Sequence, residues 1–401
     1  MTVWFEEALD ATLRQLDSQN RRRRLRSVAL PGARLVLADG RSLIDVSSND
    51  YLGLSQHRAL KTRAIEWVRR FGAGARASRL VSGTLESVLE LESRLAEFKG
   101  TEAALIFNAG YQVNATVLPA LFELAGGRDA LVFTDKLNHS SLHAGCSVAG
   151  VRQIRFRHND MDHLESLLAQ HAGGKPCFIV TESVFSMDGD RADVQRLATL
   201  ATNYNAVLYL DEAHATGVLG PAGRGLAASI VSTTSDQTKD QAKDHIVVMG
   251  TLGKAMGSAG AYIAGSKRLI DFLVNRCSGF IYSTAPTPAA CGAVEAALEL
   301  IPRMDVEREL LVQRSQRLRQ AFADLGIDTR NSSTHIIPAV LGDEAKALAA
   351  QQVLEDAGIL AIAIRPPTVP EGLSRLRFSL SSAHTAADFE RVLSALALLK
   401  P

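Results

Sequence analysis

The chain alternates short apolar runs with helical patterns from about residue 84 onward, and this alternation constrains the fold more than any other feature. The runs are "ALIF" (104–107), "ALVF" (130–133), "CFIV" (177–180), "AVLYL" (206–210), "HIVVM" (245–249) and "AYIAG" (261–265). Short apolar strands that alternate with helices are typical of a mostly parallel sheet covered on both faces. The sequence therefore predicts an α/β fold built on such a sheet.

The segments on either side of this region predict two further parts. Residues 5–20 carry apolar side chains at helical spacing, and "ARLVLADGRSLIDVS" predicts a hairpin that turns at Asp39 and Gly40. From about residue 286, two long helical patterns precede further strands and helices. We expect an N-terminal helix and hairpin arm over 1–46, a large α/β domain over 47–285 and a small C-terminal α+β domain over 286–401.

Two local patterns give further expectations. The pattern "TLESVLELESRLAEFKG" predicts a helix that Thr84 caps and Gly100 ends. Residues 228–244 are polar, which favours a solvated surface loop.

Composition excludes several classes of partner. The 401 residues carry a net charge of +1, so no overall field draws the chain to nucleic acid or to an anionic membrane. No apolar run is long enough to span a membrane, and the acidic N-terminus does not resemble a secretory signal. The four cysteines form no CxxC pair, so neither a metal site nor a disulfide framework is indicated. We expect a cytoplasmic protein with small-molecule partners.

Polar side chains follow the apolar runs, where an open parallel sheet binds its ligands. These are Gly110 and Tyr111, His139, Ser186, Asp211 and His214, and Thr251 and Lys254. Each has an ordinary structural explanation: a carboxylate can cap a helix, a histidine can be structural, and a lysine can lie on the surface. Together they suggest chemistry, because small residues around Lys254 leave its amine accessible, Asp211 could pair with a pyridine nitrogen, and the start of "NAGYQVNA" offers N–H groups to a phosphate. Pyridoxal 5′-phosphate (PLP) requires these parts.

Several motifs in order carry a more specific resemblance. They are "SSNDYLGL" (47–54), "SMDGD" (186–190), "DEAHATG" (211–217), "TLGKAMG" (251–257) and "IRPPTVP" (364–370). In this order the motifs resemble the α-oxoamine synthases, which are fold-type I PLP enzymes that condense an amino acid with an acyl thioester. The resemblance implies a large domain with a mostly parallel sheet and a smaller C-terminal domain.

The resemblance also implies roles for the residues that match its motifs. Lys254 would form the Schiff base with PLP and move protons at the α-carbon of the amino acid, and Asp211 would pair with the ring nitrogen. His214 and Ser186 would lie near the phenolic oxygen, and His139 would stack on the ring and help to polarise the thioester carbonyl.

Other cofactor contacts follow from the same resemblance. Gly110 and Tyr111 match the backbone segment beside PLP, and Thr251 matches a hydroxyl that binds its phosphate. Ser283 and Thr284 resemble residues that reach the phosphate from the other subunit, which implies a homodimer with shared active sites.

The substrate residues match motifs outside the sheet. Arg365 resembles the arginine that binds the amino acid carboxylate, and a guanidinium suits a carboxylate better than an amine does. Thr368 and Asn49 resemble further substrate contacts. Arg23, in the basic run "RRRRLR" (21–26), is the best match to an arginine near the acyl group, although such a run can equally be a solvated helix end.

Within the family, "IRPPTVP" favours L-alanine and a pimeloyl thioester, carried by CoA or by acyl-carrier protein. Arg76 and Ala77 stand where relatives often have glycine, which bears on acyl specificity. The alternatives are a glycine-using synthase, a serine-using sphingolipid-type synthase, and a catalytically silent protein that acts as a binding subunit.

Overall fold

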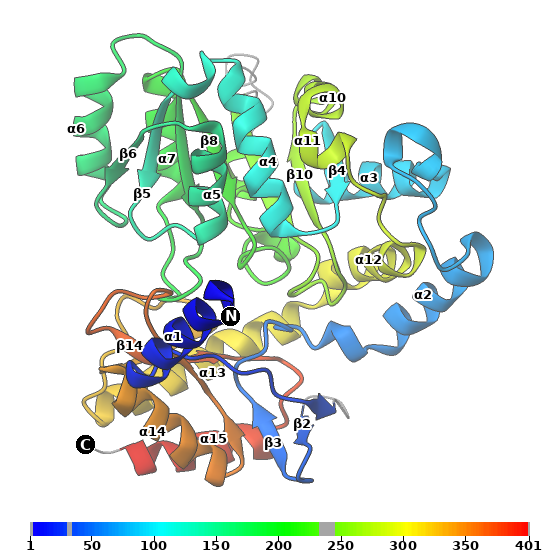
Figure 1. Ribbon diagram of the computed structural model, residues 1–401. Coiled ribbons are helices and arrows are strands. Elements are labelled where there is room, and N and C mark those ends of the chain that lie inside the picture. Colours follow the sequence, from blue (N-terminus) through cyan, green and yellow to red (C-terminus); the bar gives the residue numbers. More distant parts are fainter. Residues whose placement is uncertain (1–2, 30–33, 232–244, 400–401) are drawn as a thin grey trace. The chain divides into compact units, whose positions relative to one another are not determined.

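The computed structural model describes residues 3–29, 34–231 and 245–399, and these divide into two units (Figure 1). Unit 1 comprises residues up to Tyr51, the short segment Met187–Asp190 and the chain from Glu309 onward. Unit 2 comprises Leu52–Ser186 and Arg191–Arg308.

Unit 2 is built on a seven-stranded sheet in the order β4-β10-β9-β8-β7-β5-β6. The strands are β4 (Ala103–Phe107), β5 (Leu131–Asp135), β6 (Gln153–Phe156), β7 (Cys177–Glu182), β8 (Ala206–Asp211), β9 (Ile246–Thr251) and β10 (Ala261–Gly265). The neighbours among β5 to β9 pair in parallel, whereas β10 is antiparallel to both β9 and β4. The expectation of a mostly parallel sheet is confirmed.

Helices cover both faces of this sheet, as Figure 1 shows. On one face lie α4 (Gly110–Glu123), α5 (Ser140–Ala149), α10 (Lys267–Arg276) and α11 (Ser278–Ile281). On the other lie α3 (Glu86–Lys99), α6 (Met161–His171) and α7 (Val194–Asn203). Ile263 packs into the apolar core with α4, while its neighbour Tyr262 faces Lys99 of α3, as the alternation of side chains along a strand requires.

The start of α3 differs from the expectation. Thr84 does not cap this helix, because its N-cap residue is Leu85 and lacks a side-chain cap. Thr84 Oγ1 instead donates to Arg79 O at 2.6 Å and closes the π-helical turn η2 (Arg79–Gly83). The C-terminus of α3 is as expected, because Gly100 ends the helix with φ 73°.

The remaining helices of unit 2 include α2 (Arg58–Phe71), α12 (Pro288–Leu300) and the short α8 (Ala228–Val231). The expected surface loop over 228–244 is wrong at its start, because α8 occupies residues 228–231 with Ile230 and Val231 buried. Residues 232–244 lie outside the described residues.

Unit 1 contains two small sheets with helices beside them. One has the order β1-β2-β3-β12 and the other β11-β14-β13. The strands are β1 (Val28–Ala29), β2 (Arg34–Leu37), β3 (Ser42–Asp45), β11 (Ile336–Gly342), β12 (Ile359–Leu360), β13 (Ile362–Ile364) and β14 (Ser374–Ser379), and the helices are α1 (Trp4–Ser18), α13 (Asp305–Asp324, which begins in unit 2), α14 (Glu344–Asp356) and α15 (Ala386–Ala395). The N-terminal helix and the hairpin with its Asp39–Gly40 turn are confirmed.

The division into units differs from the expected boundaries at residues 46 and 285. Parallel pairing of β3 with β12 joins the N-terminal arm to the C-terminal part of the chain in one unit. Residues 286–308 belong to unit 2 because α12 packs along α2. Among the helices of the described ranges, none has the length and apolar character needed to cross a membrane.

Candidate active site

The carboxyl ends of β7, β8 and β9 lie side by side in unit 2. Glu182 and Asp211 are register partners at the ends of β7 and β8, and Asp211 also pairs with Met249 of β9. Because these strands are parallel, the loops that follow them start from one edge of the sheet. Both carboxylates are buried, with 2% of Glu182 and 4% of Asp211 exposed.

The structure brings together Lys254, the residue expected to move protons, and His214, which was expected near the phenolic oxygen of the cofactor. Lys254 Nζ lies 2.8 Å from His214 Nε2. His214 is buried in the loop after β8, while Lys254 is partly accessible in the loop after β9. An amine in contact with an imidazole can exchange a proton with it, which is the property expected of a catalytic lysine.

Close backbone packing explains the small residues in these two loops. Gly217 has φ 90°, and a Cβ added there would lie 2.6 Å from Ala255 Cβ. A Cβ at Gly257 would lie 2.6 Å from the backbone of Leu54. Gly253 is different, because a Cβ there would meet nothing closer than Ser258 O at 3.6 Å. Gly217 and Gly257 are therefore required by close packing, whereas a side chain at Gly253 would make only ordinary van der Waals contacts.

A hydrogen-bonded chain connects Asp211 to His139 through α4 and α5. Asn114 Nδ2 donates to Asp211 Oδ2 and to Ser141 Oγ, each at 2.9 Å. Ser141 Oγ lies 2.7 Å from His139 Nδ1. Tyr209 OH donates to Asn114 Oδ1 at 2.7 Å and fixes the orientation of the amide.

His139 and Glu182 meet at the start of α5. The backbone N–H of His139 donates to Glu182 Oε1 at 2.5 Å. Burial lowers the pKa of the His139 imidazole, with a smaller lowering by Lys254, while Asp211 raises it. Burial raises the pKa of Glu182 well above its ordinary value, and the neighbouring Asp211 raises it further. Both shifts favour the uncharged form of the group, which is the neutral imidazole for His139 and the protonated carboxyl for Glu182.

The expected phosphate residues gather around the start of α4. Gly110 and Tyr111 form its first turn, where backbone N–H groups have no carbonyl partner within the helix. Gln112 Nε2 donates to Ser283 Oγ at 2.5 Å, and Asn108 Nδ2 donates to Thr284 O at 2.6 Å. These contacts place Ser283 and Thr284 beside the α4 start of the same chain.

Two other residues that the resemblance assigns to the cofactor, Thr251 and Ser186, follow or end strands of the same sheet. Thr251 is the last residue of β9, and its Oγ1 donates to Gly260 O at 3.1 Å. Ser186 is buried after β7, with 8% of its surface exposed.

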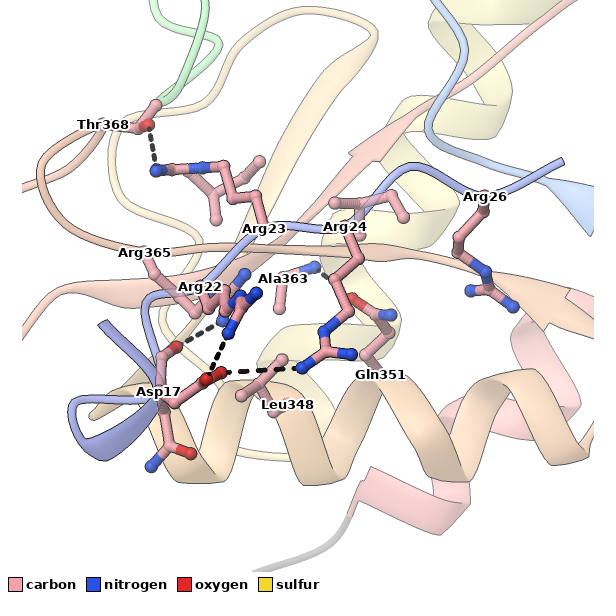
Figure 2. A pocket seen from close by; sticks show the side chains of 13 residues that line it. Asp17, Arg22, Arg23, Arg24, Arg26, Leu348, Gln351, Ala363, Arg365 and Thr368 are labelled. Atoms are coloured by element: carbon pink, nitrogen blue, oxygen red, sulfur yellow. Dashed lines mark hydrogen bonds and ion pairs between the residues drawn. The ribbon is translucent and has the colours of Figure 1, made fainter. Parts of the chain in front are cut away.

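Three of the expected substrate residues line one cavity in unit 1, drawn in Figure 2. The cavity holds about 480 Å³. Arg23 donates to Thr368 Oγ1 at 3.3 Å, and Arg365 donates to Asn20 O. Asp17 pairs with Arg22 of the wall at 2.6 Å and faces Arg24 at 3.7 Å, so its single charge offsets one of these two arginines.

Charge in this cavity is therefore unbalanced at Arg23 and Arg365. Burial lowers the pKa of the Arg365 guanidinium, and the neighbouring Arg23 lowers it further. Both remain cationic, since a guanidinium does not deprotonate in proteins. The cavity has the electrostatic character of an anion site.

Asn49 does not line this cavity. Its Oδ1 accepts from Tyr51 OH at 3.0 Å and from the Arg377 guanidinium at 3.3 Å within unit 1. These contacts give Asn49 a structural role in the loop after β3.

Sequence reasoning missed three polar residues of the site, namely Asn114, Ser141 and Glu182. Glu182 ends β7, one residue beyond Thr181 and the apolar run 177–180, and could have been found by the rule that located Asp211. Asn114 lies one helical turn after Gly110, so helical spacing places both on one side of α4. Nothing in the local sequence around Ser141 indicates its partners.

Comparison with known proteins identifies the family. The model of aminotransferase class I and II matches residues 41–396. The chain belongs to this family. An 8-amino-7-oxononanoate synthase of Gluconacetobacter diazotrophicus is 53% identical over 397 residues, which cover 98% of this chain and 96% of that protein.

Two solved structures are similar to this chain over most of its length. A serine palmitoyltransferase from S. paucimobilis with bound PLP and myriocin covers 100% of this chain and 98% of its own, with TM-score 0.87 and 24% identity, which shows the shared fold. An 8-amino-7-oxononanoate synthase from Francisella tularensis covers 89% of this chain and 97% of its own, with TM-score 0.74 and 25% identity. Within the class I and II aminotransferase family, the chain is therefore a member of the 8-amino-7-oxononanoate synthase group.

Proposed function

We propose that this protein condenses L-alanine with a pimeloyl thioester and releases CO2 and the free thiol to give 8-amino-7-oxononanoate, a step of biotin synthesis. The relative from Gluconacetobacter diazotrophicus carries this enzyme name at 53% identity. The proposed cofactor is PLP, which when bound supplies an electron sink for negative charge at the α-carbon of the amino acid.

The residues of unit 2 fit this cofactor. Asp211 offers a buried carboxylate whose Oδ1 accepts a hydrogen bond from Ala213 N at 2.9 Å. The carboxylate can also accept a hydrogen bond from a protonated ring nitrogen. Lys254 offers an amine to the aldehyde, and the first turn of α4 offers N–H groups to the phosphate. His139, Ser186 and Thr251 are proposed to contact the ring and the phosphate as the family resemblance implies.

The contact between Lys254 Nζ and His214 Nε2 carries this proposal. An amine that removes the α-proton of alanine must first be unprotonated, and His214 at 2.8 Å can hold the proton that Lys254 gives up. His139, with its imidazole neutral, can donate a hydrogen bond to the thioester carbonyl from Nε2, because Nδ1 accepts from Ser141 N at 3.3 Å.

The cavity of unit 1 supports the choice of substrates. Arg365 is proposed to bind the alanine carboxylate, and Arg23 with Thr368 is proposed to bind an anionic group of the acyl donor. Two cationic groups in one cavity suit a pair of anionic substrates.

We further propose a cytoplasmic homodimer. Large apolar side chains are exposed near Ser283 and Thr284, which the resemblance assigns to the phosphate of the other subunit: Leu80, Val81, Tyr111 and Tyr282. Exposed apolar side chains that gather near a functional segment mark an interface. The four cysteines are free and buried, which supports a reducing compartment.

In the decisive assay, the protein is incubated with PLP, one amino acid and one acyl donor, and the release of free thiol is followed. The amino acids are alanine, glycine and serine, and the donors are acetyl-, succinyl-, pimeloyl- and palmitoyl-CoA. Alanine with the pimeloyl donor should exceed every other pair by about tenfold or more in kcat/KM. A parallel reaction with pimeloyl-acyl-carrier protein identifies the natural donor. Preference for glycine or serine would contradict the proposal, and PLP binding without turnover with any pair would favour the silent binding subunit.

A further inference from the structure

The dipeptide Asp211–Glu212 sends its two carboxylates to opposite faces of the sheet. Asp211 contacts Asn114 of α4 on one face. Glu212 contacts Lys99 of α3 on the other face, where Lys99 Nζ donates to Glu212 Oε2 at 2.7 Å. Because successive side chains alternate along a strand, the residue next to Asp211 must serve the opposite side.

The Lys99–Glu212 ion pair is completely buried, with no exposed surface on either side chain. Lys99 Nζ also donates to Arg224 O, and Glu212 Oε1 accepts from Ala227 N at 2.8 Å. Burial lowers the pKa of the Lys99 amine, but Glu212 and Tyr262 together raise it by more, so the resulting pKa lies above the ordinary value. The pair is therefore a charged connection between α3, the end of β8 and the segment 224–227.

Backbone and side-chain bonds join this pair to the loop that carries His214. Glu212 O accepts from both Ala215 N and Thr216 N at 3.0 Å, which closes the turn around His214. Thr216 Oγ1 bonds to Tyr262 OH at 2.8 Å. A Cβ at Gly250 would lie 2.3 Å from that hydroxyl, so Tyr262 lies directly against β9, the strand that leads to Lys254.

We propose that Lys99 and Glu212 form a positioning element that holds the His214 loop against β9, and so keeps His214 Nε2 in contact with Lys254 Nζ. The proposal rests on the proposed function, since it concerns the same lysine and histidine. In this proposal Lys99 and Glu212 act through His214 and not by contact with the substrate. The element acts from the face of the sheet opposite to Asp211.

The test uses the PLP-loaded protein and the pH titration of the absorbance of PLP bound at Lys254, at saturating PLP. Lys99→Met should shift the titration midpoint by about half a pH unit or more, because Lys254 loses a fixed partner. His214→Asn should also shift it. If Lys99 acts through His214, the double variant should shift no further than His214→Asn alone.

Glu92→Gln is the matched control. Glu92 is a buried carboxylate of the same unit that accepts from Arg79 at 2.8 and 2.9 Å, so its loss destabilises unit 2 without touching the His214 loop. Its titration midpoint should equal that of the unmodified protein. An equal shift in this control would overturn the proposal, because general loosening of the fold would then explain the effect.

A second variant guards against poor folding of Lys99→Met. Thr216→Val keeps the side-chain shape and removes the bond to Tyr262, so a shift in the same direction is expected. Unchanged midpoints in Thr216→Val and Lys99→Met, or shifts that add to that of His214→Asn, overturn the positioning role. An unmodified protein that gives no PLP absorbance at all overturns the proposed function itself, which separates the two failures.

Discussion

Asn114 Nδ2 donates to Asp211 Oδ2 at 2.9 Å, from a helix that begins with the residues expected to bind a phosphate. The same nitrogen donates to Ser141 Oγ, and Tyr209 OH holds the carbonyl end of the amide. Both N–H bonds and the acceptor of Asn114 are therefore engaged. A donor fixed in this way holds the carboxylate in one orientation.

Replacing Asn114 by leucine should lower kcat/KM by about 10- to 100-fold, because a hydrogen bond to a charged group contributes about 1.5–3 kcal/mol. The measurement is the thiol-release assay on protein whose far-UV circular dichroism is unchanged. Ser147→Ala is the control, since among the described contacts the hydroxyl of this exposed serine bonds only to His143 O. Unaltered turnover in a folded Asn114→Leu protein would show that Asp211 does not need this donor.

Lys254→Ala should abolish turnover even with added PLP, because the change removes the amine that lies 2.8 Å from His214 Nε2. Borohydride reduction followed by peptide mass spectrometry should place the cofactor on Lys254 in the unmodified protein. Lys267→Ala removes an exposed lysine of the same unit and should retain full activity. Normal turnover by Lys254→Ala would rule out the proposed mechanism.

Glu182 should make the protein less stable as pH rises above its ordinary pKa of 4.5, because its pKa is raised well above that value in the fold. The folded state then keeps a proton that the unfolded state releases, so unfolding becomes easier by about 1.4 kcal/mol per pH unit until the folded pKa is reached. Glu182→Gln should remove this component of the slope. Urea unfolding of the PLP-free protein at several pH values measures it.

Identical pH slopes for Glu182→Gln and the unmodified protein would contradict the protonated state of Glu182. Asp39→Asn is a suitable control. Bonds from Arg41 lower the pKa of this exposed carboxyl, so any effect on stability should appear at acid pH, below its ordinary value of 3.8.

Changes at Arg365 and Arg23 in the unit 1 cavity should raise the KM of different substrates. Arg365→Lys should raise the KM for alanine by about tenfold or more, since an amine cannot form the planar double contact with a carboxylate. Arg23→Ala should raise the KM for the acyl donor and leave that for alanine nearly unchanged. Arg24→Ala is the matched control, because its side chain is 74% exposed and faces Asp17 at 3.7 Å. If Arg23→Ala and Arg24→Ala change the KM for the acyl donor equally, the basic run is a solvated segment and Arg23 has no specific role in substrate binding.

Val81→Glu and Tyr282→Glu should each weaken the proposed dimer, because these side chains are 79% and 84% exposed in the single chain. Light scattering during size exclusion, at several protein concentrations, should show a shift toward monomer and a parallel loss of activity. Leu124→Glu alters a residue that is 65% exposed at the other end of α4 and should leave the mass unchanged. A dimer that survives both changes would place the interface elsewhere.

The sequence predicted the central strands well because β7, β8 and β9 are buried on both faces and read as continuous apolar runs. It missed the edge strand β6, since Arg155 in "QIRF" is exposed and interrupts the apolar pattern. The wrong cap at Thr84 has a similar origin. Local spacing identifies a hydroxyl before a helix, but it does not reveal that Arg79 already engages that hydroxyl.

Asp211, His214 and Lys254 were candidates because parallel strands bring their carboxyl ends to one edge of a sheet, and Glu182 was overlooked although the same rule applies to it. Asn114 and Lys99 were not candidates, because each meets its partner from a helix far away in the sequence. The pairs Asn114–Asp211 and Lys99–Glu212 span 97 and 113 residues. No local pattern records such contacts, which only the packing of helices on the sheet creates.

The closeness of Gly217 to Ala255 has a consequence for engineering. An added methyl group at position 217 would lie 2.6 Å from Ala255 Cβ, between the loop that carries His214 and the loop that carries Lys254. One extra carbon atom would clash with Ala255 and force the two loops, and with them the imidazole and the amine, further apart. The distance between the two reactive groups therefore depends on the absence of a side chain at Gly217.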